Sequence, residues 1–105
     1  MATRKKVQLI TPRELPAICR AVWERERQRR PGITQAALAL ELAGDDPKKE
    51  SYRTAAGRTY VSRAINGTKR LEAQGHDGLE SFRLEMIEHL TGEATRGPFY
   101  EVPVL

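Results

Sequence analysis

Apolar residues recur every three or four positions in four short stretches of this sequence, and each stretch ends at a residue that stops helices. The residues of these stripes are Leu15, Ile18, Cys19, Val22 and Trp23, then Leu38 and Leu42, then Val61, Ala64 and Ile65, and finally Leu79, Phe82, Met86, Ile87 and Leu90. This spacing places side chains on one face of an α-helix, whereas a half-buried strand requires strict alternation. The sequence therefore predicts an all-α fold, a compact bundle of four to five helices.

Two positions compete for the beginning of the first helix. Thr11-Pro12 followed by Glu14 has the residues of a capping box with proline at the first helical position. Leu15-Pro16 is the alternative, because Pro16 lacks the donor that a ladder already under way would need. In either case Pro31-Gly32 stops the helix.

Caps and glycines bound the three helices that follow. Their expected limits are the Thr34 cap to Gly44, about Arg58 to Ile65 between Gly57 and Asn66-Gly67, and the capping box Asp77–Glu80 through to Thr91-Gly92. The small residues Ala39 and Ala43 give the second helix a face that packs closely against a neighbour. The interval 45–56 is open between a short extra helix after Asp46-Pro47 and a mobile loop.

These limits indicate one helical domain with an extended segment at each side. The expected division is a basic arm over residues 1–10, a domain over 11–92 that contains the 45–56 insert, and an extended tail over 93–105. Lys5 to Ile10 is expected to be an extended arm or an edge strand, and the Pro-broken tail an edge segment.

Charge is divided unevenly along the chain. Residues 1–70 carry 16 Lys and Arg against 7 Asp and Glu, a balance of +9. Residues 71–105 carry 2 against 7, a balance of −5. Such a division favours one basic face for a polyanion and a separate region with another role, although an unevenly charged solvated surface gives the same totals.

Several function classes lack the residues they would need. The longest apolar stretch, residues 36–42, is too short to cross a bilayer, and no apolar core of signal-peptide length follows the basic start. Cys19 is the single cysteine, so we expect no internal disulfide and a cytoplasmic location. We also expect a buried thiol there, no metal site at His76 or His89, no cofactor and no enzymatic activity.

Two short strings resemble a known family. They are residues 34–42, TQAALALEL, and residues 61–67, VSRAING. The first resembles the opening helix of the lambda-repressor-like helix-turn-helix family, also called the Cro or xenobiotic-response-element type. The second resembles the end of that family's recognition helix. The resemblance covers about residues 15–90 and implies a helix-turn-helix bundle that binds double-stranded DNA.

The resemblance also implies roles for individual residues. Arg58, Thr59 and Arg63 would read bases in the major groove, where the forked donors of arginine match the O6 and N7 atoms of guanine. Val61 and Ile65 would face the core. The residues expected at the DNA backbone, from the resemblance and from their charge, are Thr34, Gln35, Lys48, Lys49, Arg53, Tyr60, Asn66, Lys69 and Arg70.

The chain departs from the family pattern between the two helices. The family has a tight turn there, whereas Ala39 to Val61 is about a dozen residues longer than that pattern. An insertion is tolerated if it loops away from the core. Lys48, Lys49 and Arg53 lie in this insert, and for this reason we expect them to contact phosphates rather than bases.

The expected function is a sequence-specific DNA-binding transcriptional regulator, in the form of a bacterial, phage or mobile-element repressor. One recognition helix contacts too few base pairs for strong specificity, so a homodimer is expected. We expect the dimer interface in the C-terminal third, where the last helix exposes an apolar stripe and the tail adds Phe99, Tyr100, Val102, Val104 and Leu105. Trp23 is expected to lie in the core or at that interface. The alternative is a protein-binding module, an antitoxin or a mobile-element inhibitor, that uses the same fold on an unknown protein partner.

Overall fold

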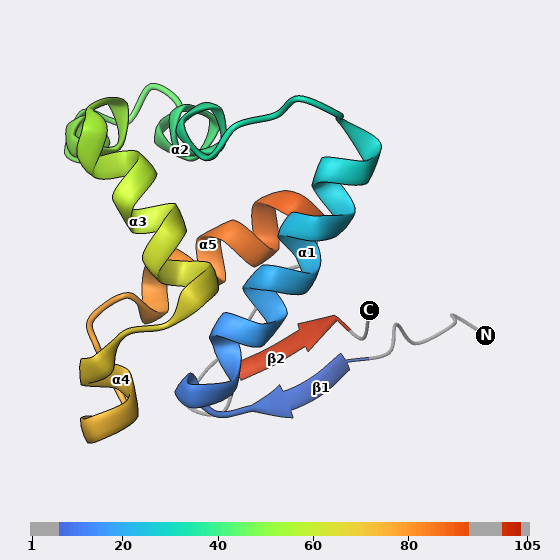
Figure 1. Cartoon of the computed structure of the whole chain (residues 1–105), viewed down its shortest axis with the longest axis vertical. Helices are drawn as coiled ribbons and strands as arrows, with labels where there is room; N and C mark the ends of the chain where they lie inside the picture. The colour runs from blue at the N-terminus through green and yellow to red at the C-terminus, as the bar shows by residue number, and fades with distance from the viewer. Residues whose placement is uncertain (1–6, 93–99, 104–105) are drawn as a thin grey trace.

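The computed structural model describes residues 7–92 and 100–103 of the chain. Its elements, in chain order, are strand β1 (Val7–Ile10), the 3-10 helix η1 (Pro12–Glu14), α1 (Leu15–Arg29), α2 (Gln35–Ala43), the 3-10 helix η2 (Pro47–Arg53), α3 (Ala55–Asn66), α4 (Lys69–Gln74), α5 (Glu80–Thr91) and strand β2 (Tyr100–Pro103). The predicted all-α fold is confirmed, with one small sheet beside the helices (Figure 1).

α1 runs through the middle of the bundle and packs against both α3 and α5 (Figure 1). The large apolar side chains of the core cluster come from β1 and four helices and are Ile10 of β1, Leu15, Cys19, Val22 and Trp23 of α1, Leu38 and Leu42 of α2, Val61 and Ile65 of α3, and Phe82, Met86 and Ile87 of α5. The apolar stripes that predicted the helices therefore face one common core. Trp23 is among these residues, so the structure places it in the core of the single chain.

α2 and α3 approach each other at two small residues. Ala39 is fully buried, and a methyl group added at Gly57 would lie 2.9 Å from the Ala39 Cβ and 2.1 Å from the carbonyl oxygen of Tyr52. Glycine at position 57 thus allows α3 to pass directly over α2 and η2. The insert does not loop away from the core, since η2 packs against both helices.

The beginning of α3 differs from the prediction. The helix begins at Ala55, and the hydroxyl of Thr54 accepts a hydrogen bond from the Ala56 amide. Gly57 was expected to precede the helix, but it lies inside it, and its small size serves the close approach rather than a boundary. Gly67 ends the helix as expected, with a positive φ of 76°.

The first helix begins at the later of the two predicted positions. Leu15 is the first residue of α1, while Thr11 and Glu14 form a capping box at the beginning of η1.

α4 was not predicted at all. It spans six residues, is capped by Thr68 through the Leu71 amide, and ends at Gly75 in the left-handed conformation.

The two extended segments pair with each other. β1 and β2 are antiparallel, with Val7 opposite Pro103 and Ile10 opposite Tyr100. The sheet lies beside α1, away from α3 (Figure 1). The edge-strand alternative for residues 7–10 is therefore the one observed, whereas the rest of the predicted arm and most of the predicted tail lie outside the described residues.

The expected exposed stripe on the last helix is wrong. Phe82 and Met86 of α5 are 5% and 0% exposed, because they pack into the core of their own chain against α1 and its neighbours. Leu79 and Leu90 are half-buried. α5 therefore presents far less apolar surface to a second copy than the sequence pattern suggested.

Candidate nucleic-acid interface

A groove of about 450 Å³ runs between the beginning of α2 and the outer side of α3. It is lined by Gln35 from α2 and by Ala55, Arg58, Thr59, Ser62 and Arg63 from α3. All three residues that the sequence assigned to base reading therefore lie in one groove, together with Gln35 from the other string. Ser62 was not predicted as a site residue, and it belongs to the same surface.

The basic side chains of this surface are not neutralised by the protein. Among the described residues, five lysine and arginine side chains form no hydrogen bond or ion pair, and they are Arg25, Lys48, Arg58, Arg63 and Lys69. Three of the five lie on α3 and at the beginning of α4. α3 contains no acidic residue, so its exposed side carries positive charge.

A second groove of about 370 Å³ continues from Arg63 to the beginning of α4. It is lined by Arg63, Thr68, Arg70, Asp77 and Leu79. Arg63 lies in both grooves, which makes the surface continuous from Gln35 to Arg70. Lys69 is exposed on the first turn of α4, a helix that the sequence did not predict.

The C-terminal end of α3 is held by a buried arginine from α5. Arg83 is fully buried, and its Nε and Nη2 atoms donate to the carbonyl oxygens of Ala64 and Arg63 at 3.1 and 3.2 Å. Arg20 of α1 donates to the next carbonyl, that of Ile65, at 3.0 Å. The Arg63 carbonyl also accepts from the Gly67 amide at 2.9 Å, whereas the carbonyls of Ala64 and Ile65 lie beyond this last bond of the helix, and the two arginines supply their donors.

Asp77 neutralises Arg83 and joins three helix ends. Its two carboxylate oxygens accept from Nη1 and Nη2 of Arg83 at 2.8 and 2.9 Å. It also accepts from the Thr68 hydroxyl, which caps α4, and from the Leu79 amide before α5. Burial alone would raise the pKa of Asp77, but the hydrogen bonds from Arg83, Thr68 and Leu79 outweigh it and lower the pKa to about 2.

Other predicted backbone-contacting residues have local structural roles as well. The Thr34 hydroxyl accepts from the Ala37 amide and caps α2. Asn66 donates to the Ser62 hydroxyl, and Arg70 donates to Gln74, each at about the limit of hydrogen-bond length. Since Asn66 and Arg70 are exposed, these contacts leave them accessible to a ligand.

Three of the residues predicted to contact the DNA backbone have partners within the protein itself. Lys49 of η2 forms an ion pair with Glu85 of α5 at 2.8 Å and lies half-buried over the ring of Tyr52. Arg53 pairs with Glu50 and donates to the Gly44 carbonyl. These two contacts tie the insert to α5 and α2.

Tyr60 is the third. Its ring lies among those of Tyr52 and Phe82, with centroids 5.7 and 5.9 Å away. This aromatic contact holds η2 against α3 and α5. Of the predicted residues in the insert, Lys48 alone is exposed with its side chain unpaired in the described structure.

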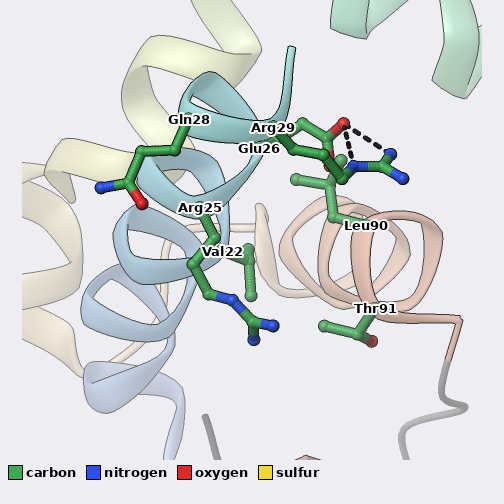
Figure 2. A pocket seen from close by; sticks show the side chains of 7 residues that line it. All are labelled: Val22, Arg25, Glu26, Gln28, Arg29, Leu90 and Thr91. Atoms are coloured by element: carbon green, nitrogen blue, oxygen red, sulfur yellow. Dashed lines mark hydrogen bonds and ion pairs between the residues drawn. The ribbon is translucent and has the colours of Figure 1, made fainter.

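Another hollow of the described surface lies between α1 and α5 (Figure 2). Its volume is about 550 Å³, and Val22 and Leu90 form its apolar wall. Arg29 is paired with the buried carboxylate of Glu26, as the dashed lines in Figure 2 show, and Arg25 is unpaired. Gln28 and Thr91 complete its lining, which contains no cysteine, histidine or pair of carboxylates.

The remaining chemical groups fit structural roles. Burial raises the pKa of the Cys19 thiol to about 12, partly offset by the charge of Arg83, and its Sγ lies 3.7 Å from the Arg83 carbonyl. The expected buried thiol is thus confirmed. Within residues 7–92 and 100–103 no cluster of His, Cys, Asp or Glu is arranged to hold a metal ion. None of the helices in this same part of the chain is long and apolar enough to span a membrane.

Comparison of the chain with protein-family models, with curated proteins and with solved structures finds no match in any of the three. The case for a function therefore depends on the chain's own surface.

Proposed function

We propose that the protein binds double-stranded DNA through the outer side of α3 and acts as a sequence-specific transcriptional regulator, in the form of a repressor. The observation that carries this proposal is the groove in which Gln35 of α2 meets Arg58, Thr59 and Arg63 of α3. A single α-helix fits the major groove of B-DNA, and α3 offers two exposed, unpaired arginines to the same surface groove.

The distribution of charge supports the same proposal. Unpaired cations on α3 and α4 are available to phosphates, because no carboxylate of the described protein competes for them. The amide groups at the beginning of α2 lie beside Gln35, and the positive end of a helix dipole favours a phosphate there. Arg58 and Arg63 would then take base edges while Gln35, Asn66, Lys69 and Arg70 take the backbone.

The packing of α3 against the core, and the contacts at its C-terminal end, support base reading. Val61, Ala64 and Ile65 are buried, so the opposite side of the helix, with Thr59 and Arg63, is the side left for a ligand. The helix is closed at its end by Arg20 and Arg83. A rigid support of this kind is what a bidentate arginine–guanine contact needs.

We further propose a homodimer, because one such helix covers too few base pairs for a specific site. The sheet that β1 and β2 form has two strands in the described structure, and a two-stranded sheet is marginally stable alone. Its outer edge is where a second copy would pair. A two-fold dimer then requires a palindromic operator with half-sites about 34–36 Å apart.

Binding of a fluorescent random-sequence duplex, followed by anisotropy over a series of salt concentrations, tests the proposal. The expected result is binding at low salt whose logarithm falls steeply and linearly with the logarithm of the salt concentration. Absence of binding even at low salt would contradict DNA binding and would favour the alternative of a module for a protein partner. The Arg25→Ala variant is the matched control for variants of Arg58 and Arg63, since Arg25 is equally unpaired but lies in the hollow between α1 and α5.

A further inference from the structure

α3 is supported separately in its two halves. The first half is held by η2 and α2, through the Thr54 cap, the contact of Gly57 with Ala39 and Tyr52, and the Tyr60 ring. The second half is held at its carbonyl end by Arg83 and Arg20. The two arginines of the proposed interface are divided between these halves, with Arg58 in the first and Arg63 in the second.

We propose that Arg83 is a positioning residue that fixes the direction in which Arg63 reads a base, while the direction of Arg58 is set independently by η2 and α2. This inference rests on the proposed DNA-binding function. It assigns a specificity role to a side chain that is fully buried and that a ligand cannot touch.

The connection between the two residues is direct. Nη2 of Arg83 donates to the carbonyl oxygen of Arg63 itself, and Nε donates to that of the next residue, Ala64. Helix ends fray because their last carbonyls lack partners within the helix. Ala64 and Ile65 are buried and hold this part of α3 on the core, and the Gly67 amide donates to the Arg63 carbonyl at 2.9 Å. Arg83 adds a second donor to that carbonyl and supplies one to the carbonyl of Ala64, so it fixes the last peptide groups from outside the helix.

Asp77 sets the position of Arg83 in turn. Its carboxylate binds two nitrogens of the guanidinium and is itself fixed by Thr68 and Leu79, so every polar atom of the pair has a partner. A buried network of this kind is rigid when complete. Lysine at position 83 would keep the positive charge but lose the fork that spans Asp77 and the two carbonyls.

The first half of α3 has no contact of this kind with Arg83. Its support is steric, since Gly57 lies against the Tyr52 carbonyl and the Ala39 methyl group. Arg83 variants are therefore expected to leave Arg58 as it stands. This division distinguishes a positioning role from general stabilisation, which would affect both arginines equally.

Hydrogen exchange of the free protein gives the first test. In Arg83→Lys we expect the amides of residues 64–67 to exchange about tenfold faster than in the wild type, while those of residues 59–62 change much less. Asp77→Asn should do the same, and it keeps the inference testable if Arg83→Lys fails to fold. Val22→Ala, a core truncation in α1 at a residue that lines the hollow between α1 and α5, is the control that lowers global stability. Equal acceleration in both halves would overturn the inference.

Selection of bound sequences from a random DNA pool gives the second test. Arg83→Lys and Asp77→Asn should relax the preference at the base position that Arg63→Ala relaxes and keep the preference that Arg58→Ala abolishes. In a double-mutant comparison, Arg83→Lys should add little to Arg63→Ala but should add fully to Arg58→Ala. Preferences that relax at both positions alike, or at neither, would overturn the positioning role while wild-type binding stands. Absence of any duplex binding by the wild type overturns the proposed function instead, and with it the role of Arg83 in positioning Arg63 for base reading.

Discussion

Arg83 and Asp77 form a buried, two-pronged ion pair, with Nη1–Oδ1 and Nη2–Oδ2 distances of 2.8 and 2.9 Å. Through it the end of α3, the cap of α4 and the beginning of α5 are connected at one point. The attachment of the proposed recognition helix to α4 and α5 thus depends on this ion pair. For this reason the stability of the folded protein is expected to be sensitive to acid.

The acid sensitivity has a definite sign. The pKa of Asp77 is lowered from 3.8 to about 2 in the folded protein, so the pair stabilises the fold above about pH 4, and this contribution is lost as the pH falls toward 2. We expect the difference in free energy of unfolding between wild type and Asp77→Asn to shrink by about 2 kcal/mol from pH 5 to pH 2. Urea denaturation at a series of pH values measures this. A difference that stays constant over the range would show that Asp77 is not ionised as the pair requires.

The sequence predicted the helices whose apolar stripes face the core. It also predicted correctly which side chains of residues 61–65 are buried and which are exposed. Val61 and Ile65 are buried and Arg63 is exposed, because helical periodicity alone separates these positions. Gln35 joins the α3 residues in one groove because two consecutive helices cross closely. The beginning of α3 was missed because glycine usually interrupts a helix, and only the contact with Ala39 explains Gly57 inside one.

Pairings over long distances along the chain could not be predicted from local patterns. Arg83 lies between Phe82 and Leu84, and an arginine within an apolar stripe is ordinarily read as exposed. Lys49 seemed available to DNA, since its partner Glu85 lies on a different helix. In both cases the missing information is tertiary, because a charge is neutralised by a residue that the fold alone brings near.

Gly57→Ala should destabilise the protein, although alanine is ordinarily the better helix former. The φ angle of Gly57 is not positive, so the backbone accepts alanine, but the added methyl group meets the Tyr52 carbonyl at 2.1 Å. We expect a net loss of about 1–3 kcal/mol from this overpacking. The control Ala36→Gly, on the exposed side of α2, should lose about 0.5–1 kcal/mol from helix propensity alone. Stabilisation by Gly57→Ala in chemical denaturation would show that α3 and η2 are not in close contact.

Lys69 and Lys49 should differ in their effect on DNA binding. Lys69→Ala removes an unpaired cation and is expected to weaken binding to all sequences and to reduce the salt slope by about 1. Lys49→Ala breaks the ion pair with Glu85, so it should leave the salt slope unchanged and cost at most about 1 kcal/mol of stability. Anisotropy titrations at several salt concentrations compare the two. A lower slope for Lys49→Ala would mean that the insert contacts phosphates after all.

Cys19 should be inert in the native protein. Its thiol is fully buried and its pKa is raised to about 12, so very little of the reactive thiolate forms at neutral pH. We expect a thiol reagent at pH 8 to label the folded protein only at the rate of unfolding, and to label it at once in urea. Complete labelling of the folded protein within the mixing time would show that the packing of α1 against α5 is open.

The selected-sequence profiles of Arg58→Ala and Arg63→Ala test the central claim most directly. Both residues are exposed on α3, so their replacement should leave the thermal stability within about 0.5 kcal/mol of wild type. Each variant is expected to lose roughly 1–3 kcal/mol on the preferred site and to relax the preference at one base position in each half-site, with a different position for each arginine. If both variants keep the wild-type profile and affinity, α3 does not read DNA.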